Sequence, residues 1–502
     1  MGKSISRRSV LKGALGVGAG VTAASILSPS LLAAAPIPQK WDETFDVVIV
    51  GTGFAGFAAA IEAHDAGAKV IILEKAKVIG GNSMIASGAY NSAHPEKQKA
   101  QGIEDSPDLH YQQTLAGGDF RADPEKVRYF ADHALEGLKW LESQGIPFEE
   151  KVYTVVGALH PRSHDPANKG RGALIVNGLK KQVDTRKIPV KMETQVTGIV
   201  RAEPLKGDVL GVEVSEKGGN KQYIQALKAV ILATGGFGAD VPNRSKYNPR
   251  LDKDLPTTNV PWATMEAIIS AQDIGADVTG MDFIQLLVAC NYFTKKYGDL
   301  ANLGIDHAVY LNLAGERFVA EDARRDVLAA GALAQSEKVF LWVADDRATK
   351  RYSQERTQQA LDKGLCFKAD TLEELAKICQ DKLKVPSDKF LASVKRYNEL
   401  VKSGGDTDFN KTTPNLKTVE VGPFYASPTQ AGVHHTMGGL RTKGVTGQVL
   451  DRNANAIPRL YAAGEVAGGL HGTNRLGGNA TTDCIVFGRL AGQNAAKEKT
   501  RA

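Results

Sequence analysis

The chain has 502 residues, more than one ordinary domain contains, so we expect more than one hydrophobic core. Hydrophobic residues make up 42% and charged residues 24%, which excludes a disordered chain and a protein with many membrane spans. The net charge is +6, and it falls to +2 without the first 35 residues, which hold four Lys and Arg but no Asp or Glu. This balance supplies no clustered basic face, so we expect no nucleic-acid partner.

The first 35 residues have the pattern of an export signal. Arg7-Arg8 precede a Gly- and Ala-rich apolar run over 13–27, and the small residues Ala33-Ala34-Ala35 end the segment. Paired arginines in Ser-Arg-Arg-x-x-Leu-Lys resemble a twin-arginine signal, and the run is too short and glycine-rich for a membrane-spanning helix. We predict a twin-arginine signal peptide at residues 1–35 and a periplasmic mature protein. A disordered basic terminus is the alternative.

Cysteine spacing predicts neither a disulfide framework nor a haem attached to this chain. The four cysteines are widely separated, and no Cys-x-x-Cys-His sequence occurs: Cys290, Cys366, Cys379 and Cys484. Paired spacings of metal ligands are also absent from the sequence. We therefore expect no metal site, and we expect any haem that serves this protein to belong to another chain.

A strand, a glycine turn and a helix follow one another where the mature chain is expected to begin. Residues 45–50 are a β-branched apolar run typical of a buried parallel strand. They lead into Gly51-Thr-Gly53-Phe-Ala-Gly56, and residues 57–66 have a helix-forming composition. This order makes a Gly-x-Gly-x-x-Gly sequence specific for dinucleotide binding.

Each glycine of this motif has its own expected function. Gly51 permits the tight turn, Gly53 lets a pyrophosphate approach the backbone, and Gly56 lets the helix pack close to the sheet. The helix N-terminus offers N–H groups to the phosphates. A second strand at 69–73 ends at Glu74, whose carboxylate can accept hydrogen bonds from both ribose hydroxyls. That acceptor favours an adenosine ribose without a 2′-phosphate.

Three further glycine turns are spread along the chain. Their sequences are Gly80-Gly81-Asn82-Ser83, Thr234-Gly235-Gly236 and Gly464-Glu465, and the last two follow strand-like runs. Such spacing fits a backbone wrapped around a long, extended cofactor in a flavin domain that an insertion interrupts. The surplus of glycine, 52 residues in all, thus has a local explanation.

Several separate motifs carry a resemblance to a known family. Besides the fingerprint with Glu74, they are Gly80–Ser83, Ala233–Gly236, Gly315–Phe318 with Arg325-Asp326, His434–Gly439, and the run from Gly464 to Ala480. From about Asp46 to Gly492 the chain resembles the fumarate reductase/succinate dehydrogenase flavoprotein family. Within it the chain resembles the soluble periplasmic branch, of the flavocytochrome c flavin-subunit type, which includes acrylate, methacrylate and urocanate reductases.

The resemblance implies an α/β fold in which a Rossmann-like FAD-binding domain is interrupted by an α+β capping domain. We expect the FAD-binding domain at 44–280 and 429–498 and the capping domain at 281–428. Within the latter, the sequence predicts a strand at 308–313 and helices at 371–384 and 387–401, followed by a loop at 402–415. In this family the capping domain closes over the substrate.

The resemblance also implies the residues that hold FAD. Carried over position by position, they are Gly51, Gly53, Ala55, Gly56, Glu74, Lys75, Gly81, Asn82, Ser83, Ser87, Gly88, Val196, Ala233, Thr234, Gly235, His435, Glu465, Asn479 and Ala480. His435 matches a backbone contact to the flavin ring, and Glu465 matches a contact to the ribityl chain. The membrane-bound branch links its flavin to a histidine near residues 80–88. No histidine lies there in this chain, so non-covalent FAD is expected.

Three residues are implied in the chemistry, which transfers a hydride from flavin N5 to one carbon of an activated C=C bond and a proton to the other. Arg325 matches the proton donor, and His434 and Arg475 match the residues that bind the substrate carboxylate. Arginine is a poor acid alone, so we expect carboxylates close to it in sequence to return its proton; these are Glu321, Asp322 and Asp326. An exposed helix with a Glu321–Arg325 ion pair is the alternative.

The chain departs from the family where fumarate reductases bind a second carboxylate. Their Gln-x-His-Pro-Thr is replaced by Gln285-Leu-Leu287-Val-Ala289, so Leu287 stands where a histidine is expected. Their Thr-Glu-x-x-Arg is missing, and its place falls on Leu300, Ala301 and Gly304. The residues that bind one carboxylate are retained, and we expect the other end of the pocket to be apolar. We therefore predict a 2-enoate with one carboxylate, such as acrylate, methacrylate or an aryl-acrylate, for which Leu287 contacts the substrate.

The proton route and the electron source remain open at this stage. Asp306, His307 and Tyr310 are nearby candidates for an alternative proton route. Reduced nicotinamide is scarce outside the cytoplasmic membrane, so the expected electron donor is a separate multihaem c-type cytochrome or a quinol-oxidising membrane module.

Three other functions compete with the enoate reductase. They are a fumarate reductase proper, a flavin dehydrogenase of a ketosteroid-like apolar substrate, and a non-catalytic flavin electron carrier. The retained His434 and Arg475 argue against the ketosteroid, and the retained Arg325 argues against the carrier.

Overall fold

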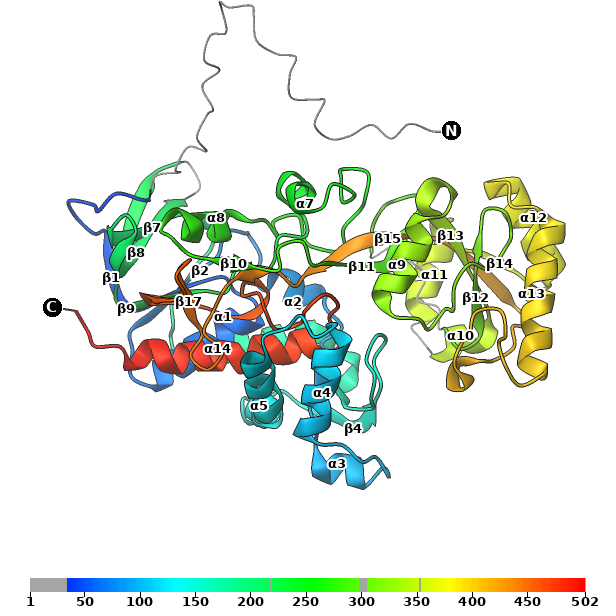
Figure 1. Ribbon diagram of the computed structural model, residues 1–502, viewed down its shortest axis with the longest axis horizontal. Coiled ribbons are helices and arrows are strands. Elements are labelled where there is room, and N and C mark those ends of the chain that lie inside the picture. Colours follow the sequence, from blue (N-terminus) through cyan, green and yellow to red (C-terminus); the bar gives the residue numbers. More distant parts are fainter. Residues whose placement is uncertain (1–33, 217–218, 298–304, 352–353, 502) are drawn as a thin grey trace, which may run out of the picture. The chain divides into compact units, whose positions relative to one another are not determined.

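The computed structural model describes residues 34–216, 219–297, 305–351 and 354–501. The expected export signal lies outside the described residues except for Ala34 and Ala35, and Leu300, Ala301 and Gly304 also lie outside them. Figure 1 labels many of the described elements and shows their order along the chain by colour.

An eight-stranded sheet forms the first layer. Its central strand is β1 (Glu43–Val50), which pairs in parallel with β2 (Val70–Leu73) on one side and with β9 (Lys221–Leu232) on the other. The remaining strands extend it at both ends: β6 (Val190–Lys191) beside β2, β18 (Ala456–Ala462) and then β17 (Gln448–Leu450) beside β9, and the antiparallel β7 (Thr194–Glu203) and β8 (Lys206–Glu216).

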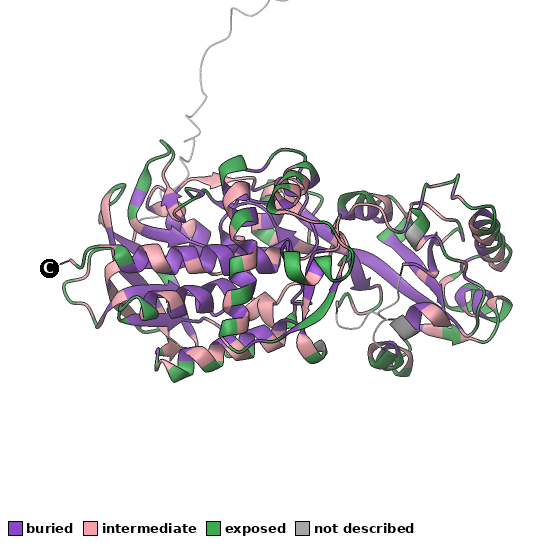
Figure 2. Ribbon diagram, turned by 90° about the horizontal axis from the view of Figure 1, so that it is seen from below, coloured by how far each residue is buried: buried purple, intermediate pink, exposed green. Residues whose placement is uncertain are grey.

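Both faces of this sheet are covered, because side chains of β1 alternate between two cores. Val47 and Ile49 pack into one core with the helices α1 (Phe54–Asp65) and α14 (Asn479–Lys497), whereas Val48 and Val50 pack into the other with β7, β8 and α8 (Glu266–Asp273). A strand buried on both faces reads as a continuous apolar run, which is why residues 45–50 predict it. Figure 2 shows these strands as buried.

A second, five-stranded sheet lies in the segment where the capping domain is expected. Its order is β11 (Ile284–Asn291), β15 (Phe424–Thr436), β13 (Val339–Asp345) and β12 (Ala308–Asn312), with β14 (Phe367–Ala369) also paired to β15. The helices α9 (Arg325–Leu333), α12 (Leu372–Leu383) and α13 (Ser387–Lys402) accompany it.

Elements of this segment agree with their predicted bounds to within two residues. The expected domain boundary at 428/429 falls inside the continuous strand β15. The first half of β15 pairs with β13 and β14, and its second half pairs with β11.

Further helices and strands connect these elements. They are α2 (Gly81–Ile85), β3 (Tyr90–Asn91), α3 (Pro95–Lys99), α4 (Pro107–Gly117), α5 (Pro124–Ser143), β4 (Phe148–Tyr153), β5 (Ser163–Pro166), α6 (Arg171–Thr185), α7 (Val241–Tyr247), β10 (Val278–Thr279), α10 (Asp346–Arg351), α11 (Gln354–Asp362) and β16 (Gly439–Leu440).

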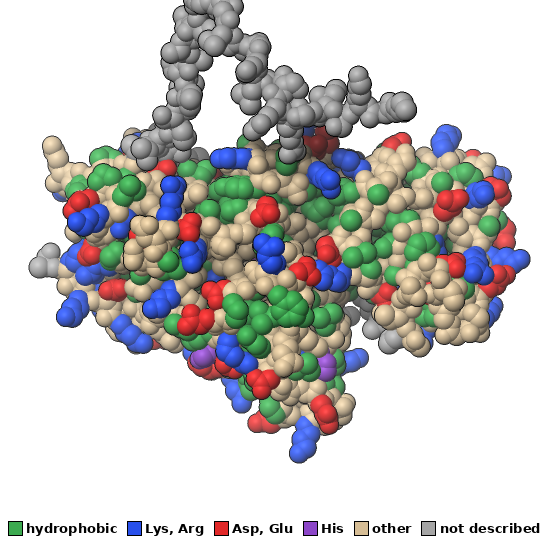
Figure 3. All heavy atoms as spheres, viewed as in Figure 1, with side chains coloured by type: hydrophobic (Ala, Val, Ile, Leu, Met, Phe, Trp, Pro, Cys, Tyr) green, Lys and Arg blue, Asp and Glu red, His purple; other side chains and the backbone are tan. Residues whose placement is uncertain are grey.

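The surface and the cysteines agree with the composition. Figure 3 shows Lys and Arg interspersed with Asp and Glu on the face in view. All four cysteines are free thiols, and three of them are buried. Within the described ranges, no helix combines the length and the apolar character needed to cross a membrane.

Candidate active site

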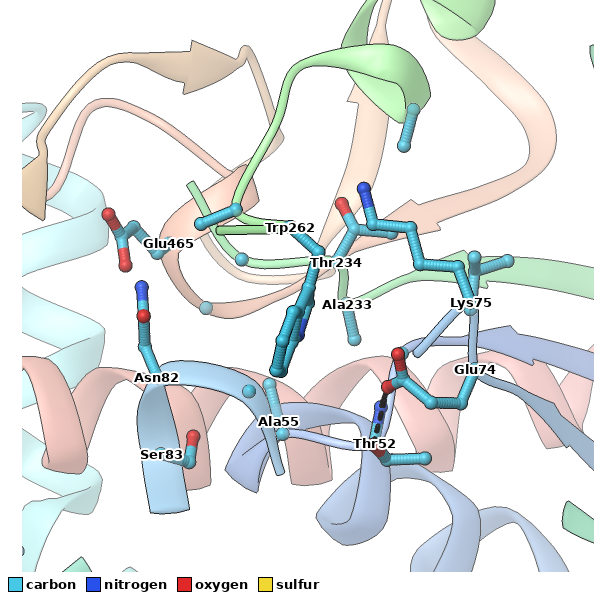
Figure 4. Close-up of a pocket in the computed structure, with 18 of the residues that line it drawn as sticks. Thr52, Ala55, Glu74, Lys75, Asn82, Ser83, Ala233, Thr234, Trp262 and Glu465 are labelled. Carbon is cyan, nitrogen blue, oxygen red and sulfur yellow. Dashed lines mark hydrogen bonds between the residues drawn. The ribbon is translucent and has the colours of Figure 1, made fainter. Parts of the chain in front are cut away.

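A cavity opens where the strands β1, β2, β9 and β18 end. Its wall includes the last residues of β1 and β2, Val50 and Leu73, and the residues that follow β9 and β18, Ala233 and Ala463. In open parallel sheets, ligands bind at the carboxyl ends of the strands. Figure 4 shows side chains from several of these turns pointing into the same space.

The first glycine turn has the geometry that its sequence predicts. Gly51 has φ +109°, and a Cβ there would lie 2.4 Å from the carbonyl oxygen of Ala233. A Cβ at Gly56 would lie 2.0 Å from the carbonyl oxygen of Gly51. The helix α1 starts at Phe54, three residues earlier than predicted, so Gly56 lies in its first turn. Both glycines are therefore required by close backbone approach.

Glu74 is held by the turn that precedes α1. Its Oε2 accepts hydrogen bonds from the Thr52 hydroxyl at 2.5 Å and the Thr52 N–H at 3.2 Å, and its Oε1 accepts one from Ala76 N–H at 2.8 Å. The carboxylate retains acceptor capacity on the cavity side, since two oxygens offer about four lone-pair positions. Lys75, next in the chain, donates to Thr264 Oγ1 at 2.5 Å and to Glu266 Oε2 at 3.1 Å.

Most residues implied in FAD binding line this cavity. Those in its wall are Gly51, Gly53, Ala55, Glu74, Lys75, Gly81, Asn82, Ser83, Val196, Ala233, Thr234, Gly235 and Glu465. Outside its wall are Gly56, Ser87, Gly88, His435, Asn479 and Ala480. Asn479 instead joins a buried polar cluster, accepting from Asn91 Nδ2 at 2.8 Å and donating to Thr114 Oγ1 at 3.1 Å.

Two lining residues that sequence reasoning missed are Trp262 and Cys484. The Trp262 side chain projects into the cavity (Figure 4), and its indole N–H is buried with no hydrogen-bond partner among the described residues. Trp262 follows Asn259, whose side chain accepts a hydrogen bond from Asn82 Nδ2 at 2.5 Å. No glycine or charge pattern marks this loop, so no sequence signal pointed to it.

Glu465, in the turn that follows β18, lines the cavity and contacts the end of β15. Glu465 Oε1 accepts hydrogen bonds from Thr436 N–H at 2.9 Å and from the Thr436 hydroxyl at 3.1 Å. Burial raises the pKa of Glu465 to about 7. Both ring nitrogens of His435, which is 5% exposed, lack hydrogen-bond partners in the described part of the chain. These buried polar atoms and the glycine turns fit the hydroxyl-rich, phosphate-bearing FAD.

A second cluster forms around Arg325, the first residue of α9. Its guanidinium is 9% exposed and donates from Nη1 to Gln285 Oε1 at 3.1 Å and from Nη2 to the Val156 carbonyl at 2.6 Å. Gln285 Nε2 in turn donates to the carbonyl of Arg475 at 2.9 Å. Gln285 therefore connects the two arginines, a link that its place in a divergent motif did not predict.

Burial lowers the proton affinity of both arginines. Burial, followed by the charge of Arg475, lowers the pKa of Arg325 to about 9. Burial lowers the pKa of Arg475 to about 10. Neither guanidinium forms an ion pair with a carboxylate among the described residues. Buried cations without a counterion favour an anionic ligand.

His434 is the extra residue of a β-bulge. In the pairing of β11 with β15, Gln285 faces His435 and Leu286 faces Val433, so His434 has no partner in the ladder. Bulges redirect side chains beside active sites. Its Nδ1 lies 2.7 Å from the Thr258 hydroxyl, and burial together with Arg475 and Arg325 lowers its pKa well below 6.5. The ring is therefore neutral and can donate through Nε2 while Thr258 donates to Nδ1.

The alternative of an exposed helix with a Glu321–Arg325 ion pair is wrong. Glu321 instead pairs with Arg317 at 3.0 Å and lies 3.4 Å from Lys411, because α9 begins only at Arg325 and no helical turn joins the two residues. Asp326 binds Arg324 at 3.0 Å. The carboxylate relay expected from sequence spacing is therefore not formed by these side chains.

The other expected proton-route residues lie elsewhere as well. Asp322 accepts a hydrogen bond from Thr412 N–H at 2.9 Å. Tyr310 packs between Phe340 and Trp342. His307 Nδ1 lies 3.0 Å from the Thr418 carbonyl, and Asp306 is buried in the turn before β12. None of these contacts leads to Arg325.

Leu287 lies on the same face of β11 as Gln285, because side chains two residues apart share a face. Leu286 and Val288 occupy the opposite face and pack into the core with Leu328 of α9. Leu287 is half-buried, and it shares its face of β11 with Gln285, which contacts Arg325. The apolar replacement predicted from the sequence thus lies two positions from the residue that holds Arg325.

Comparisons with known proteins agree with this arrangement. Residues 46–481 match the family described as FAD binding domain. Fumarate reductase (cytochrome) from Shewanella frigidimarina is 39% identical over 460 residues, covering 91% of this chain and 77% of the relative. Acrylate reductase flavoprotein subunit from Shewanella woodyi is 31% identical, covering 97% of each chain. The open conformation of a flavocytochrome c3 fumarate reductase superposes with a TM-score of 0.77 at 34% identity, covering 91% of this chain and 79% of that one.

The parallel sheet and its cavity thus define an FAD-binding flavoprotein, and the predicted fold class and cofactor are confirmed. The chain belongs to the FAD-binding family of the fumarate reductase type. It is an FAD-dependent oxidoreductase of the class that acts on C=C bonds.

Proposed function

We propose that the chain is an exported respiratory reductase of 2-enoates that carry one carboxylate. The observation that supports it most strongly is the pair of buried guanidiniums, Arg325 and Arg475, which lack a carboxylate partner among the described residues and lie beside the apolar Leu287. A single carboxylate would compensate one of these two positive charges. Two carboxylates would leave one of them against Leu287 without a hydrogen-bond donor.

Arg475 and His434 bind the substrate carboxylate in this proposal. A guanidinium can hold a carboxylate through two parallel hydrogen bonds, which fixes the plane of the conjugated C=C bond. The neutral His434, oriented by Thr258, adds a donor through Nε2. Together they draw negative charge toward the carboxylate and stabilise the enolate-like transition state of hydride addition.

Arg325 supplies the proton to the α-carbon. Bound FAD would supply the hydride to the β-carbon, and two electrons from an external donor together with one proton from solvent would restore the reduced flavin for the next turnover. Gln285 and the Val156 carbonyl accept hydrogen bonds from two nitrogens of Arg325 and so fix the direction of the third, Nε, and of the remaining N–H groups. The lowered pKa of Arg325 makes release of a proton easier than from an exposed arginine. FAD is held without a covalent bond and should be released by denaturation.

Turnover of a reduced viologen dye tests this proposal. The purified holoprotein is supplied with acrylate, methacrylate, cinnamate, urocanate or fumarate, and dye oxidation is followed. We expect at least one monocarboxylate to be reduced about a hundredfold more efficiently than fumarate, since a site built for one anion rejects a second by this order. Absence of turnover with every enoate would overturn the reductase, and preferred turnover of fumarate would overturn the monocarboxylate.

Fumarate reductase proper is the second candidate, because the 39% identical relative carries that name. The fumarate arm of the same assay decides between the two. An Arg325→Ala variant is the control for both, since either reaction uses the same proton donor.

Export and the electron donor complete the proposal. Arg7-Arg8 support twin-arginine export to the periplasm, where a multihaem c-type cytochrome or a quinol-oxidising membrane module would deliver electrons. Cell fractionation tests whether the protein is exported to the periplasm. An Arg7→Lys/Arg8→Lys double variant should remain in the cytoplasm, and equal periplasmic amounts of both forms would contradict export by this route.

A further inference from the structure

One exposed carboxylate connects the two chain segments that carry Arg325 and Arg475. Asp119 lies between α4 and α5 and binds Arg324, the residue immediately before Arg325. The pair is bidentate, with Nη1 to Oδ1 at 2.9 Å and Nη2 to Oδ2 at 3.0 Å. Asp326 binds the same guanidinium through Nε at 3.1 Å and Nη2 at 3.0 Å. Arg324 is therefore held on both sides at the start of α9.

The same carboxylate also holds the loop of the second arginine. The Thr473 hydroxyl donates a hydrogen bond to Asp119 Oδ2. Thr473 N–H donates to the Gly118 carbonyl at 3.2 Å, and a Cβ at Gly118 would lie 2.4 Å from the His471 carbonyl oxygen. The turn at 118–119 is thus packed against residues 471–473, two positions before Arg475.

The backbone at this turn is strained. Asp119 and Phe120 are consecutive non-glycine residues with φ +55°. Both are in the left-handed region, which costs free energy for residues with a Cβ and is rare for a bulky aromatic. Burial of the Phe120 ring does not compensate for this strain, because the residue is 74% exposed. Strain of this kind persists where neighbouring contacts hold it, and it often marks functional sites.

We propose that Asp119 is a positioning residue: by binding Arg324 and Thr473 together, it fixes Arg325 and Arg475 at the separation at which one enoate contacts both. The reaction in this statement rests on the proposed function, whereas the contact itself does not. Asp119 touches neither arginine directly, so it acts through the main chain of residues 324–325 and 473–475. A small displacement of a catalytic group can slow a reaction by orders of magnitude.

The dependence of reductase turnover on salt distinguishes this positioning role from a general role in folding. Asp119 and Arg324 are about half and one-third exposed, so dissolved ions screen their attraction. A bidentate, networked pair of this kind is the exception among surface ion pairs, which mostly contribute little. Reductase turnover should therefore fall with ionic strength for as long as the Asp119–Arg324 pair is present.

The test compares three forms of the FAD-loaded, full-length protein: wild type, Asp119→Asn and Asp408→Asn. Asparagine keeps the size of Asp119 and an acceptor for Thr473 but removes the charge. Asp408→Asn is the matched control, since it breaks another exposed bidentate pair, with Arg396 at 3.2 and 3.0 Å, in the loop after α13. Hydrogen exchange of peptides spanning 319–333 and 469–477 is measured without substrate, and kcat is measured from low to high NaCl.

We expect Asp119→Asn to raise amide exchange in both peptides. We expect kcat to fall about tenfold at low salt, with KM changed less than kcat and FAD content unchanged. Wild type should approach the variant as salt rises, while Asp119→Asn stays flat and Asp408→Asn follows wild type. An Asp119→Asn/Arg324→Gln double variant should be no slower than Asp119→Asn alone, because both changes remove one interaction.

Unchanged exchange at 319–333 in Asp119→Asn would overturn the proposal, as would a wild-type kcat at low salt. If the wild type reduces no enoate, the proposed function fails, and the exchange measurement still decides whether Asp119 holds the two segments.

Discussion

The wall of the FAD cavity is built mainly from backbone atoms, whereas the cluster around Arg325 is built mainly from side-chain atoms. The cavity wall is mainly backbone, from turns at Gly51, Gly81 and Gly235, and it includes three carboxylates, Glu74, Glu266 and Glu465. The cluster is made of long side chains. This difference teaches that the cavity is vulnerable to an added Cβ, whereas the cluster is vulnerable to the loss of a side chain.

The two regions also differ in charge. Glu74 and Glu465 line the cavity and could accept hydrogen bonds from the hydroxyls of FAD, whereas Arg325 and Arg475 have no carboxylate partner among the described residues. One region offers acceptors for hydroxyl groups and backbone N–H groups for phosphates, and the other offers buried guanidiniums for an anion. Each prediction below changes one region and measures both.

Removing the proton donor should have the largest effect. Arg325→Ala should lower reductase turnover about a thousandfold, because general acid catalysis contributes on this order. FAD content should be unchanged, since Arg325 lies outside the cavity wall. Stopped-flow oxidation of the reduced enzyme by an enoate measures the loss. The control is Arg396→Ala, an exposed arginine on α13. Retained turnover in Arg325→Ala would remove this residue from its role.

Adding one methyl group to the cavity wall should have the next largest effect. Gly51→Ala should weaken FAD binding about a hundredfold, because the new Cβ would lie 2.4 Å from the Ala233 carbonyl oxygen. Gly67→Ala is the matched control, since Gly67 also has a positive φ, of +89°, but a Cβ there would meet nothing within 4 Å. Fluorescence titration of the apoprotein with FAD measures both. Equal FAD affinities of the two variants would show that backbone strain, and not the clash with Ala233, determines the effect of Gly51→Ala.

The pH dependence should separate the two regions next. The acid must carry its proton, so kcat should decline as pH rises through the Arg325 pKa of about 9, tenfold per unit above it. Below that value the arginine is fully protonated and its contribution is constant. FAD content should not follow this profile. A rate that stays level up to pH 10.5 would contradict a proton donor with a lowered pKa.

The smallest expected effect concerns substrate choice. Leu287→His should raise the ratio of fumarate to acrylate turnover efficiency about tenfold, because one new hydrogen bond to a charged group supplies roughly this factor. Leu205→His, at an exposed turn, is the control. An unchanged ratio would mean that Leu287 does not face the second carboxylate.

The FAD-binding half could be predicted in detail because its information is local. Gly51, Gly53, Gly56 and Glu74 follow one another within a single β-α-β unit, so their spacing defines their geometry. Trp262 escaped prediction, since it enters the cavity from a loop without a motif.

The substrate half could be predicted only in its residue types. Arg325, His434 and Arg475 were identified by resemblance, but their contacts depend on segments far apart in the chain. Sequence spacing suggested that Glu321 binds Arg325. The chain instead forms a turn before α9, and Glu321 forms an ion pair with Arg317. The contact of Gln285 with both arginine segments also depends on long-range packing.

The long strand β15 has a consequence for engineering by recombination. Its first half belongs to the sheet with β13 and β14, and its second half carries His434 and His435 beside Glu465 (Figure 1). A gene fragment that ends at residue 428 would cut this strand in two. A graft that keeps β11 and all of β15 would transfer Leu287 and His434 together, so that substrate preference could be exchanged between relatives as one piece while the glycine turns stay in place.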